Sequence, residues 1–176
     1  MAAVWDPLLR LLHWSVVIAV AVAWWAGEER LNLHVWAGYF TLAALAVRLA
    51  WGRLGGRHAR FASFVRPPRE VGRYAMAVVR GRASRHLGHN PLGGWMVLAL
   101  LLSIAVTGAS GWLYTTDRFW GMAWVEMLHK VSAWTMVGLV ALHVAGVLLT
   151  SLQHAENLVG AMLTGRKRPA AQGDVD

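Results

Sequence analysis

The stretch from Met127 to Leu152 constrains the fold of this chain more than any other. It is an apolar run long enough to cross the hydrocarbon core of a bilayer, and it carries two histidines, His129 and His143. In an α-helix, positions fourteen residues apart point the same way within about 40° and lie about 21 Å apart along the axis. This segment therefore predicts one helix that presents an imidazole near each side of a membrane.

Three more apolar segments are long enough to span a bilayer: residues 8–25, 31–51 and 92–114. The composition agrees, because 57% of the residues are hydrophobic, 15% are charged and the mean hydropathy is +0.43. Soluble domains carry about 25% charged residues. We therefore expect an all-α integral membrane protein, a four-helix bundle that forms a single domain over residues 1–168. A short tail, residues 169–176, is expected to be disordered.

The charges between the spans predict the orientation. Residues 53–91 contain one acid, Glu70, and nine arginines: Arg53, Arg57, Arg60, Arg66, Arg69, Arg73, Arg80, Arg82 and Arg85. The connections 27–30 and 115–128 are short and mixed in charge. By the positive-inside rule, both termini and the long basic loop are cytoplasmic, and the two short connections face outward. The net charge of +8 thus reflects membrane topology and not nucleic-acid binding.

Two features refine this topology. After Pro67 and Pro68, the stretch 69–82 is typical of a basic amphipathic helix on the membrane surface, with a solvated loop as the alternative. Tryptophans gather near the span ends and favour an aromatic belt over a set of electron relays. They are Trp24, Trp25, Trp36, Trp51, Trp95, Trp112, Trp120 and Trp124.

The chain has no cysteine, which excludes disulfides, thiolate metal sites and haem attached through thioethers. Ionisable groups inside a span are costly and point to function. The topology sorts the four intramembrane histidines into two pairs by depth. His13 and His143 lie near the inner side, and His34 and His129 lie near the outer side.

Two histidines at one depth on neighbouring helices suit a metal or a haem in the interior of a bundle. Singly, each is as often a helix–helix hydrogen bond as a ligand, but the joint arrangement favours a cofactor. Small residues near the ligands and on the third span would leave room for a flat macrocycle. They are Gly38, Ala133, Gly146, Gly108 and Gly111.

Cations and further histidines could complete these sites. Arg10 and Arg48 could pair with the propionates of an inner haem, or they could be snorkelling topology anchors. Lys130, Arg30 or Arg118 could serve an outer haem. His89 and His154, which lie outside the spans, are either solvated histidines or proton partners of a quinone head group.

The chain resembles bacterial cytochrome b561 and the b-type cytochrome subunits of Ni-Fe hydrogenases, the four-helix di-haem membrane cytochromes. The resemblance lies in VWDPLLRLLHW (4–14), NLHVWAGY (32–39), RLAWGRLGGRHARFASFV (48–65), GHNPLGGWM (88–96), LHKVSAW (128–134), LHVAGV (142–147) and HAENLVGAMLTGRKR (154–168). It implies two non-covalent b-type haems, with His13, His34, His129 and His143 as ligands, and electron exchange with quinone. Hydrogenase subunits of this kind often have an additional span that is not found here.

Bis-histidine ligation leaves no open position on iron, so such haems pass electrons and do not bind oxygen. The leading hypothesis is electron transfer between quinone and a periplasmic partner, either a c-type cytochrome or an oxidoreductase subunit. One alternative is a superoxide:quinone oxidoreductase, which needs a cationic funnel near the outer haem. Another is a haem-free metal transporter or membrane scaffold, which would show no haem absorbance.

Overall fold

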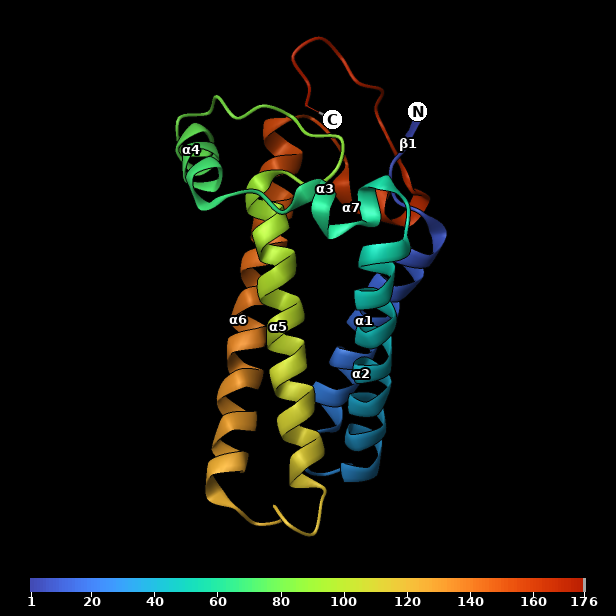
Figure 1. The fold of residues 1–176 in the computed structure, drawn as a ribbon, viewed down its shortest axis with the longest axis vertical. Helices are drawn as coiled ribbons and strands as arrows, with labels where there is room; N and C mark the ends of the chain where they lie inside the picture. Colours follow the sequence, from blue (N-terminus) through green and yellow to red (C-terminus); the bar gives the residue numbers. More distant parts are fainter. Residues whose placement is uncertain (176) are drawn as a thin grey trace. The chain divides into compact units, whose positions relative to one another are not determined.

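A computed structural model describes residues 1–175 of the chain. Its α-helices are α1 (Pro7–Ala26), α2 (Leu31–Leu54), α3 (Phe61–Phe64), α4 (Pro68–Val79), α5 (Pro91–Tyr114), α6 (Ala123–Gln153) and α7 (Leu158–Thr164) (Figure 1). A 3-10 helix, η1 (Arg57–Ala59), precedes α3, and two short strands, β1 (Ala2–Ala3) and β2 (Arg166–Lys167), complete the secondary structure. The predicted all-α class is confirmed.

Four of these helices, α1, α2, α5 and α6, are long and apolar enough to cross a membrane. They coincide with the four predicted spans. The bounds differ little: α6 begins at Ala123, before the predicted start at Met127, and α2 continues to Leu54 instead of ending at Trp51. Many of their large apolar side chains, such as Trp36 and Leu102, are exposed, as expected of surface that faces lipid.

Two of the long helices begin with the same pair of residue types. The carboxylate of Asp6 accepts a hydrogen bond from the Leu9 N–H at 2.9 Å, and Pro7 is the first residue of α1. The amide oxygen of Asn90 accepts one from the Gly93 N–H at 2.7 Å, and α5 begins with proline in the same way. The Asp or Asn side chain accepts from a backbone N–H that has no partner within the helix, and proline has no N–H that needs one. The residues at each helix start therefore determine where α1 and α5 begin.

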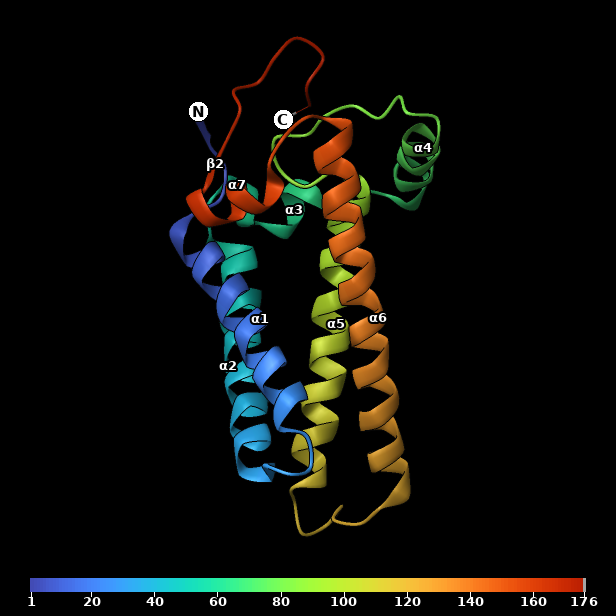
Figure 2. The same cartoon turned by 180° about the vertical axis from the view of Figure 1, so that it is seen from behind.

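The contacts divide the chain into two compact units. Unit 1 comprises Met1–Arg10, Ala50–Leu98 and Ala141–Asp176, and unit 2 comprises Leu11–Leu49 and Ala99–Val140. In unit 2 the segments of α5 and α6 lie side by side (Figure 2). Helix α1 contacts α6 through Trp24 and Trp134, whose rings meet edge to face at 4.9 Å.

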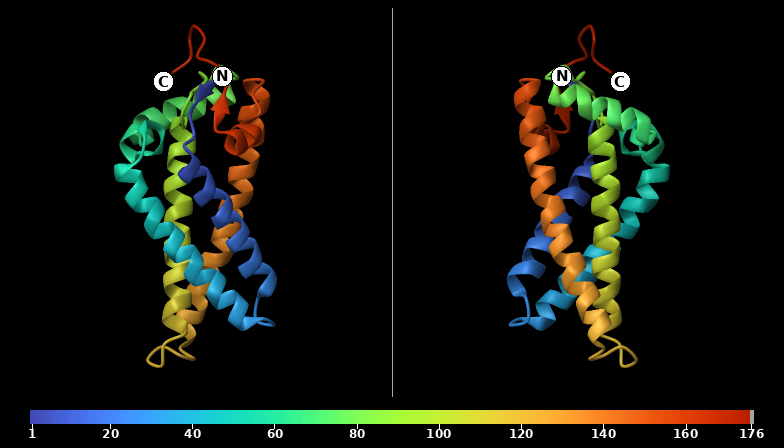
Figure 3. Two further views of the ribbon diagram at one scale, coloured as in Figure 1. Left: turned by 90° about the vertical axis from the view of Figure 1, so that its right-hand side faces the viewer. Right: turned by 90° about the vertical axis from the view of Figure 1, so that its left-hand side faces the viewer.

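Unit 1 contains most of the irregular chain. The two ends of the sequence meet here, because β1 pairs antiparallel with β2 and Ala2 lies opposite Lys167 (Figure 3). Between these ends, Trp51 at the end of α2 donates its indole N–H to both carboxylate oxygens of Asp6, at 3.1 and 3.2 Å. One predicted belt tryptophan therefore also ties the end of α2 to the start of α1.

Helix α4 occupies the part of the basic loop where the amphipathic helix is expected, and it ends at Val79, before the predicted Arg82. Its position on a membrane surface stays a prediction. Helix α7 is not predicted from the sequence. It is capped at its start by the side chain of Asn157, which accepts from the Gly160 N–H, and it ends at Gly165 with φ +79. A left-handed residue at that position is a common helix terminator.

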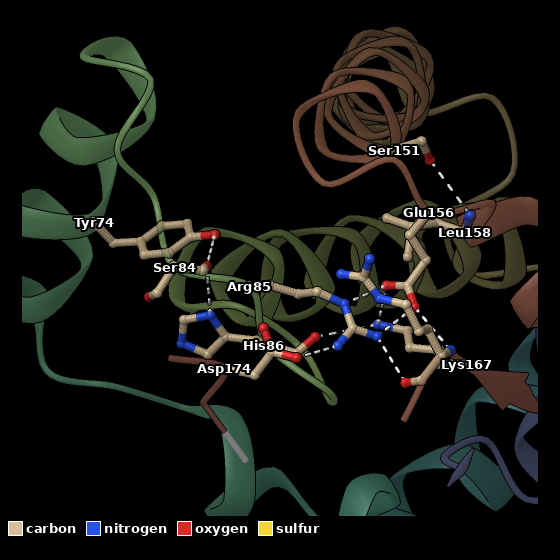
Figure 4. A network of polar contacts seen from close by, with 10 residues as sticks. Tyr74, Ser84, Arg85, His86, Ser151, Glu156, Leu158, Lys167 and Asp174 are labelled. Atoms are coloured by element: carbon tan, nitrogen blue, oxygen red, sulfur yellow. Dashed lines mark hydrogen bonds and ion pairs between the residues drawn. The ribbon is translucent and has the colours of Figure 1, made fainter. Parts of the chain in front are cut away.

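A buried group of charges joins the loop before α5 to the end of the chain (Figure 4). The guanidinium of Arg85 pairs with Glu156 at 2.5 Å and with Asp174 at 2.5 Å. Lys167 lies 4.0 Å from Glu156. The Arg85 and Lys167 side chains are only 4% and 5% exposed. Each charge therefore has an opposite charge close by, as burial demands.

Two residues of the tail contact the loop before α5. The Val175 N–H donates to the Arg85 carbonyl at 2.8 Å, and the Leu87 N–H donates back to the Val175 carbonyl at 2.9 Å. Together with the ion pair of Asp174, these bonds attach residues 174 and 175 to the loop before α5. Arg85 thus supplies partners for these two residues, and the disorder expected of residues 169–176 from their composition stays a prediction.

Candidate functional site

The His34 and His129 side chains lie next to each other in unit 2, with their rings edge to face. His34 comes from the first turn of α2 and His129 from the second turn of α6. Their ring centroids are 5.8 Å apart and their planes are inclined by 79°. The structure therefore brings together one of the two pairs that the topology predicts.

Each of these imidazoles is anchored by a backbone carbonyl of a neighbouring helix. The Nδ1 atom of His34 is 2.9 Å from the Ala23 carbonyl oxygen of α1, and that of His129 is 3.0 Å from the Thr107 carbonyl oxygen of α5. A carbonyl oxygen only accepts, so both Nδ1 atoms donate. In the neutral imidazole this places the proton on Nδ1 and leaves Nε2 with the lone pair that binds metals.

Residues of α5 also shape the surroundings of His129. A Cβ added at Gly111 would lie 3.0 Å from Cε1 of the imidazole, so only glycine allows the ring to sit there without displacement. The hydroxyl of Ser110 lies 3.4 Å from His129 Nδ1 and donates to the Thr107 carbonyl at 3.0 Å. The sequence predicts that Gly111 leaves room for a macrocycle, and in the structure its nearest neighbour is the His129 ring. A Cβ at Gly108 would meet Leu42 instead, at 2.5 Å.

This arrangement fits an iron held between two axial imidazoles. Two imidazoles that bind one metal from opposite sides through nitrogens about 2 Å away place their centroids about 6 Å apart. The observed 5.8 Å agrees with that separation. Within residues 1–175, no three His, Cys, Asp or Glu side chains are grouped to hold a metal ion. A metal at this pair therefore needs further ligands from elsewhere, such as the four nitrogens of a porphyrin.

The second predicted pair is divided between the two units. His13 lies on α1 in unit 2, where its ring meets Trp14 edge to face at 5.1 Å. His143 lies on α6 in unit 1. Each is inside a membrane-spanning helix as expected. Their pairing stays a prediction.

The cations predicted to serve propionates have different surroundings. Lys130 donates to Glu126 at 2.6 Å and lies 3.9 Å from Glu28, so two acids already balance its charge. Arg10 donates to the Leu163 carbonyl near the end of α7, and its Nε atom is buried without a hydrogen bond among the described residues. Arg48 is 8% exposed. A buried polar nitrogen needs a partner, so Arg10 fits the role better than Lys130, and the role of Arg48 stays a prediction.

The two histidines proposed for the quinone side both lie in unit 1. His89 is packed between the rings of Trp5, at 4.7 Å, and Phe64, at 4.6 Å. The Nε2 atom of His154 is buried and has no hydrogen-bond partner among residues 1–175. Neither histidine is a freely solvated surface residue.

Some residues that shape these sites carry no signal in the sequence. The carbonyls of Ala23 and Thr107 belong to the backbone, so no residue type marks them. Arg85 is one of nine arginines in the same loop, and only its burial distinguishes it. Gly111 stands out in the sequence only as a small residue, and spacing alone does not identify His129 as its neighbour.

Comparison with known families gives a match over almost the whole chain. The family model described as prokaryotic cytochrome b561 matches residues 4–165. No curated protein and no solved structure matches the chain. The matched range includes all four membrane-spanning helices and all four intramembrane histidines. The chain therefore belongs to the prokaryotic cytochrome b561 family, and it is a multi-pass membrane b-type cytochrome of electron transfer.

Proposed function

We infer that this cytochrome carries electrons across the bacterial inner membrane between a quinone and a redox partner on the periplasmic side. His34 and His129 bind an outer haem, and His13 and His143 bind an inner one. The partner is a periplasmic c-type cytochrome or a subunit of an oxidoreductase. The orientation follows from the nine arginines of residues 53–91, which the positive-inside rule assigns to the cytoplasm.

One observation supports this proposal most strongly. Both imidazoles of the His34–His129 pair donate Nδ1–H to carbonyls of other helices, so both present an unprotonated Nε2. A helix–helix hydrogen bond between the two histidines would require one of these nitrogens to donate. Binding of one iron by both histidines uses the Nε2 lone pairs of His34 and His129 together.

The chain's own residues hold, orient and insulate the redox centres. A haem bound between two imidazoles supplies a one-electron iron couple with no open coordination position. The Ala23 and Thr107 carbonyls fix the ring orientation of the ligands, and this increases their basicity. Arg10 and Arg48 offer positive charge to carboxylates at the inner site. The apolar faces of the four spans exclude water.

The quinone side is proposed at unit 1, where His89 and His154 are candidate proton partners. Reduction of a quinone takes up protons as well as electrons, so a buried imidazole nitrogen near its oxygen is useful. The buried His154 Nε2 has the required donor and acceptor chemistry. Substitution of either histidine by alanine should slow haem reduction by quinol while the haem content is unchanged.

The superoxide alternative is less well supported. An anion funnel needs unpaired cations at the outer end, but Lys130 is paired with Glu126 and Glu28. Arg30 lies 3.8 Å from Glu29 and over the ring of Trp25 at 4.2 Å. Steady superoxide consumption by the purified protein, coupled to quinone reduction, would reverse this preference.

Haem stoichiometry tests the proposal directly. A pyridine haemochrome assay should give two b haems for each chain. The His129→Ala and His34→Ala variants should each lose the same haem and retain the other, and His13→Ala and His143→Ala should do the converse. The matched control is His58→Ala, which removes a histidine outside the spans and should retain both. Absence of haem from the native chain, or loss of both haems in every ligand variant, would refute two independent sites.

A further inference from the structure

Helix α5 carries two buried hydroxyl groups, those of Ser103 and Thr107, one turn apart near its middle. The two residues are 8% and 9% exposed. Neither Ser103 Oγ nor Thr107 Oγ1 has a hydrogen-bond partner among residues 1–175. A buried hydroxyl without a partner costs free energy, so these two groups require an explanation that packing alone does not give.

Other hydroxyls of the membrane-spanning helices are bound by their own backbone. A serine or threonine inside a helix can donate to the carbonyl four residues earlier. Thr41 of α2 and Thr135 of α6 do this, each with an oxygen–oxygen distance of 2.8 Å. A proton bound in this way is fixed. Ser103 and Thr107 make no such bond, so their hydroxyl protons can turn.

The two hydroxyls lie on the face of α5 that contacts His129. Positions four residues apart on a helix point the same way within about 40°, and positions seven apart within about 20°, so Ser103, Thr107 and Ser110 share one face. The Ser110 hydroxyl lies 3.4 Å from His129 Nδ1, and the Thr107 carbonyl accepts from that nitrogen at 3.0 Å. The neighbouring Leu102 is 66% exposed. The hydroxyls therefore face the interior of unit 2 and not lipid.

A redox centre at the His34–His129 pair would act on these hydroxyls, because its charge changes by one unit with each electron. In an interior of low dielectric constant such a change acts strongly on nearby dipoles. A hydroxyl whose proton is bound by a carbonyl cannot follow the change. One that can turn points its oxygen toward the additional positive charge of the oxidised centre, and so stabilises the oxidised state more than the reduced state.

We propose that the hydroxyls of Ser103 and Thr107 lower the reduction potential of the haem at the His34–His129 pair. They contribute no ligand to the iron and act through the orientation of their dipoles. This inference rests on the proposed function, because it requires a haem at that pair. It also explains why two hydroxyls are kept in the middle of a membrane span without a partner from their own helix.

The test measures midpoint potentials of the full-length, haem-loaded protein in mild detergent by redox titration of the haem absorbance. The variants are Ser103→Ala, Thr107→Val and the two combined. The haem of interest is identified as the one that His129→Ala removes. The matched control is Thr41→Val, which removes a buried hydroxyl of the same unit whose proton is bound to its own helix. The conservative variant Thr107→Ser keeps a hydroxyl at its position.

Each single variant should shift the midpoint potential of that haem to a more positive value, and the combined variant should shift it further. Thr41→Val should shift it less, and Thr107→Ser should restore the wild-type value. An unchanged or more negative potential at full haem content would overturn this inference and leave the proposed function intact. An equal shift in Thr41→Val would also overturn it. Absence of haem from the native chain would instead refute the proposed function.

A second measurement uses the wild-type protein, so it does not depend on how well a variant retains haem. Infrared difference spectra between the reduced and oxidised states should contain an O–H stretching band, because hydroxyls that turn change their environment with the redox state. The band should be missing from the combined variant and present in Thr41→Val. Absence of the band from the wild type, or its persistence in the combined variant, would contradict the proposal.

Discussion

The His34–His129 pair and the Arg85 group, which consists of Arg85, Lys167, Glu156 and Asp174, both place polar side chains where water is excluded. The pair does so with imidazoles and the group does so with ions. In unit 2 two neutral imidazoles are satisfied by the carbonyls of Ala23 and Thr107, whereas in unit 1 four ions satisfy one another. Neutral groups within a span avoid the cost of a charge in lipid. Ion pairs suit a region outside the spans, and their strength depends on pH.

The largest expected effect tests whether the Arg85 group stabilises unit 1. Arg85→Ala leaves Glu156 buried without its main partner, so the free energy of unfolding should fall by about 3 kcal/mol or more. Denaturant titration in detergent measures this, and hydrogen exchange should show residues 166–175 becoming unprotected. The control Arg82→Ala alters an exposed arginine of the same loop and should change stability by less than about 0.5 kcal/mol. Equal effects would contradict a special role for Arg85.

The second prediction concerns the alkaline range. Burial lowers the pKa of Lys167 to about 8, with Glu156 opposing the shift, against an ordinary value of 10.5. Between these values the unfolded chain binds a proton that the folded chain has released. The free energy of unfolding should therefore rise as pH increases from about 8 to 10.5, by up to about 3 kcal/mol. The Lys167→Met variant should lose this rise, and a rise that persists in it would assign the effect to another group.

Acid should destabilise the Arg85 group, because it protonates Glu156. Burial alone would raise the pKa of Glu156, but its hydrogen bond with Arg85 and the charge of Lys167 bring it below the ordinary 4.5. A carboxylate with a lowered pKa stabilises the fold above its unfolded value, and this contribution is lost as pH falls below about 4.5. Limited proteolysis after Arg166 and Arg168 should therefore accelerate in acid. The neutral His34–His129 anchors contain no carboxylate and should not show that transition.

The fourth prediction tests the other half of the comparison, the His34–His129 pair. Gly111→Ala places a methyl group 3.0 Å from the His129 ring, so the imidazole must move away from the Thr107 carbonyl. Disturbing the support of a metal ligand typically weakens binding by about 10–100-fold. Transfer of haem to apomyoglobin measures the loss for the haem at this pair. The control Gly138→Ala adds a methyl group with no neighbour within 4 Å and should bind haem normally.

The smallest expected effect concerns Ser110. Its hydroxyl donates to the Val106 carbonyl at 2.8 Å and to the Thr107 carbonyl at 3.0 Å, so it competes with His129 for Thr107. Ser110→Ala should change stability by about 1 kcal/mol or less and shift the midpoint potential of one haem slightly. Thr135→Ala removes a similar backbone-directed hydroxyl from α6 and should leave both potentials unchanged. A large shift in either variant would mean that the Thr107 carbonyl does not control His129.

The sequence predicts the features that depend on long runs of residues. The four spans follow from long, mainly apolar stretches, and the His34–His129 pair follows from depth alone, because the bilayer fixes where each helix begins and ends. What the sequence does not predict depends on single tertiary contacts. Backbone carbonyls carry no residue label, Arg85 is one of nine arginines in its loop, and Asp174 lies in a tail whose composition suggests disorder.

The pairing of β1 with β2 has a consequence for biosynthesis. Ala2 is synthesised long before its strand partner, Lys167. Contacts between such distant positions form late, because a long loop must close before they can be made. The spans can insert one after another, but unit 1 is completed only after Lys167 has been made. A truncated product that stops before Arg166 would therefore have an unpaired N-terminal strand, which quality-control proteases could recognise.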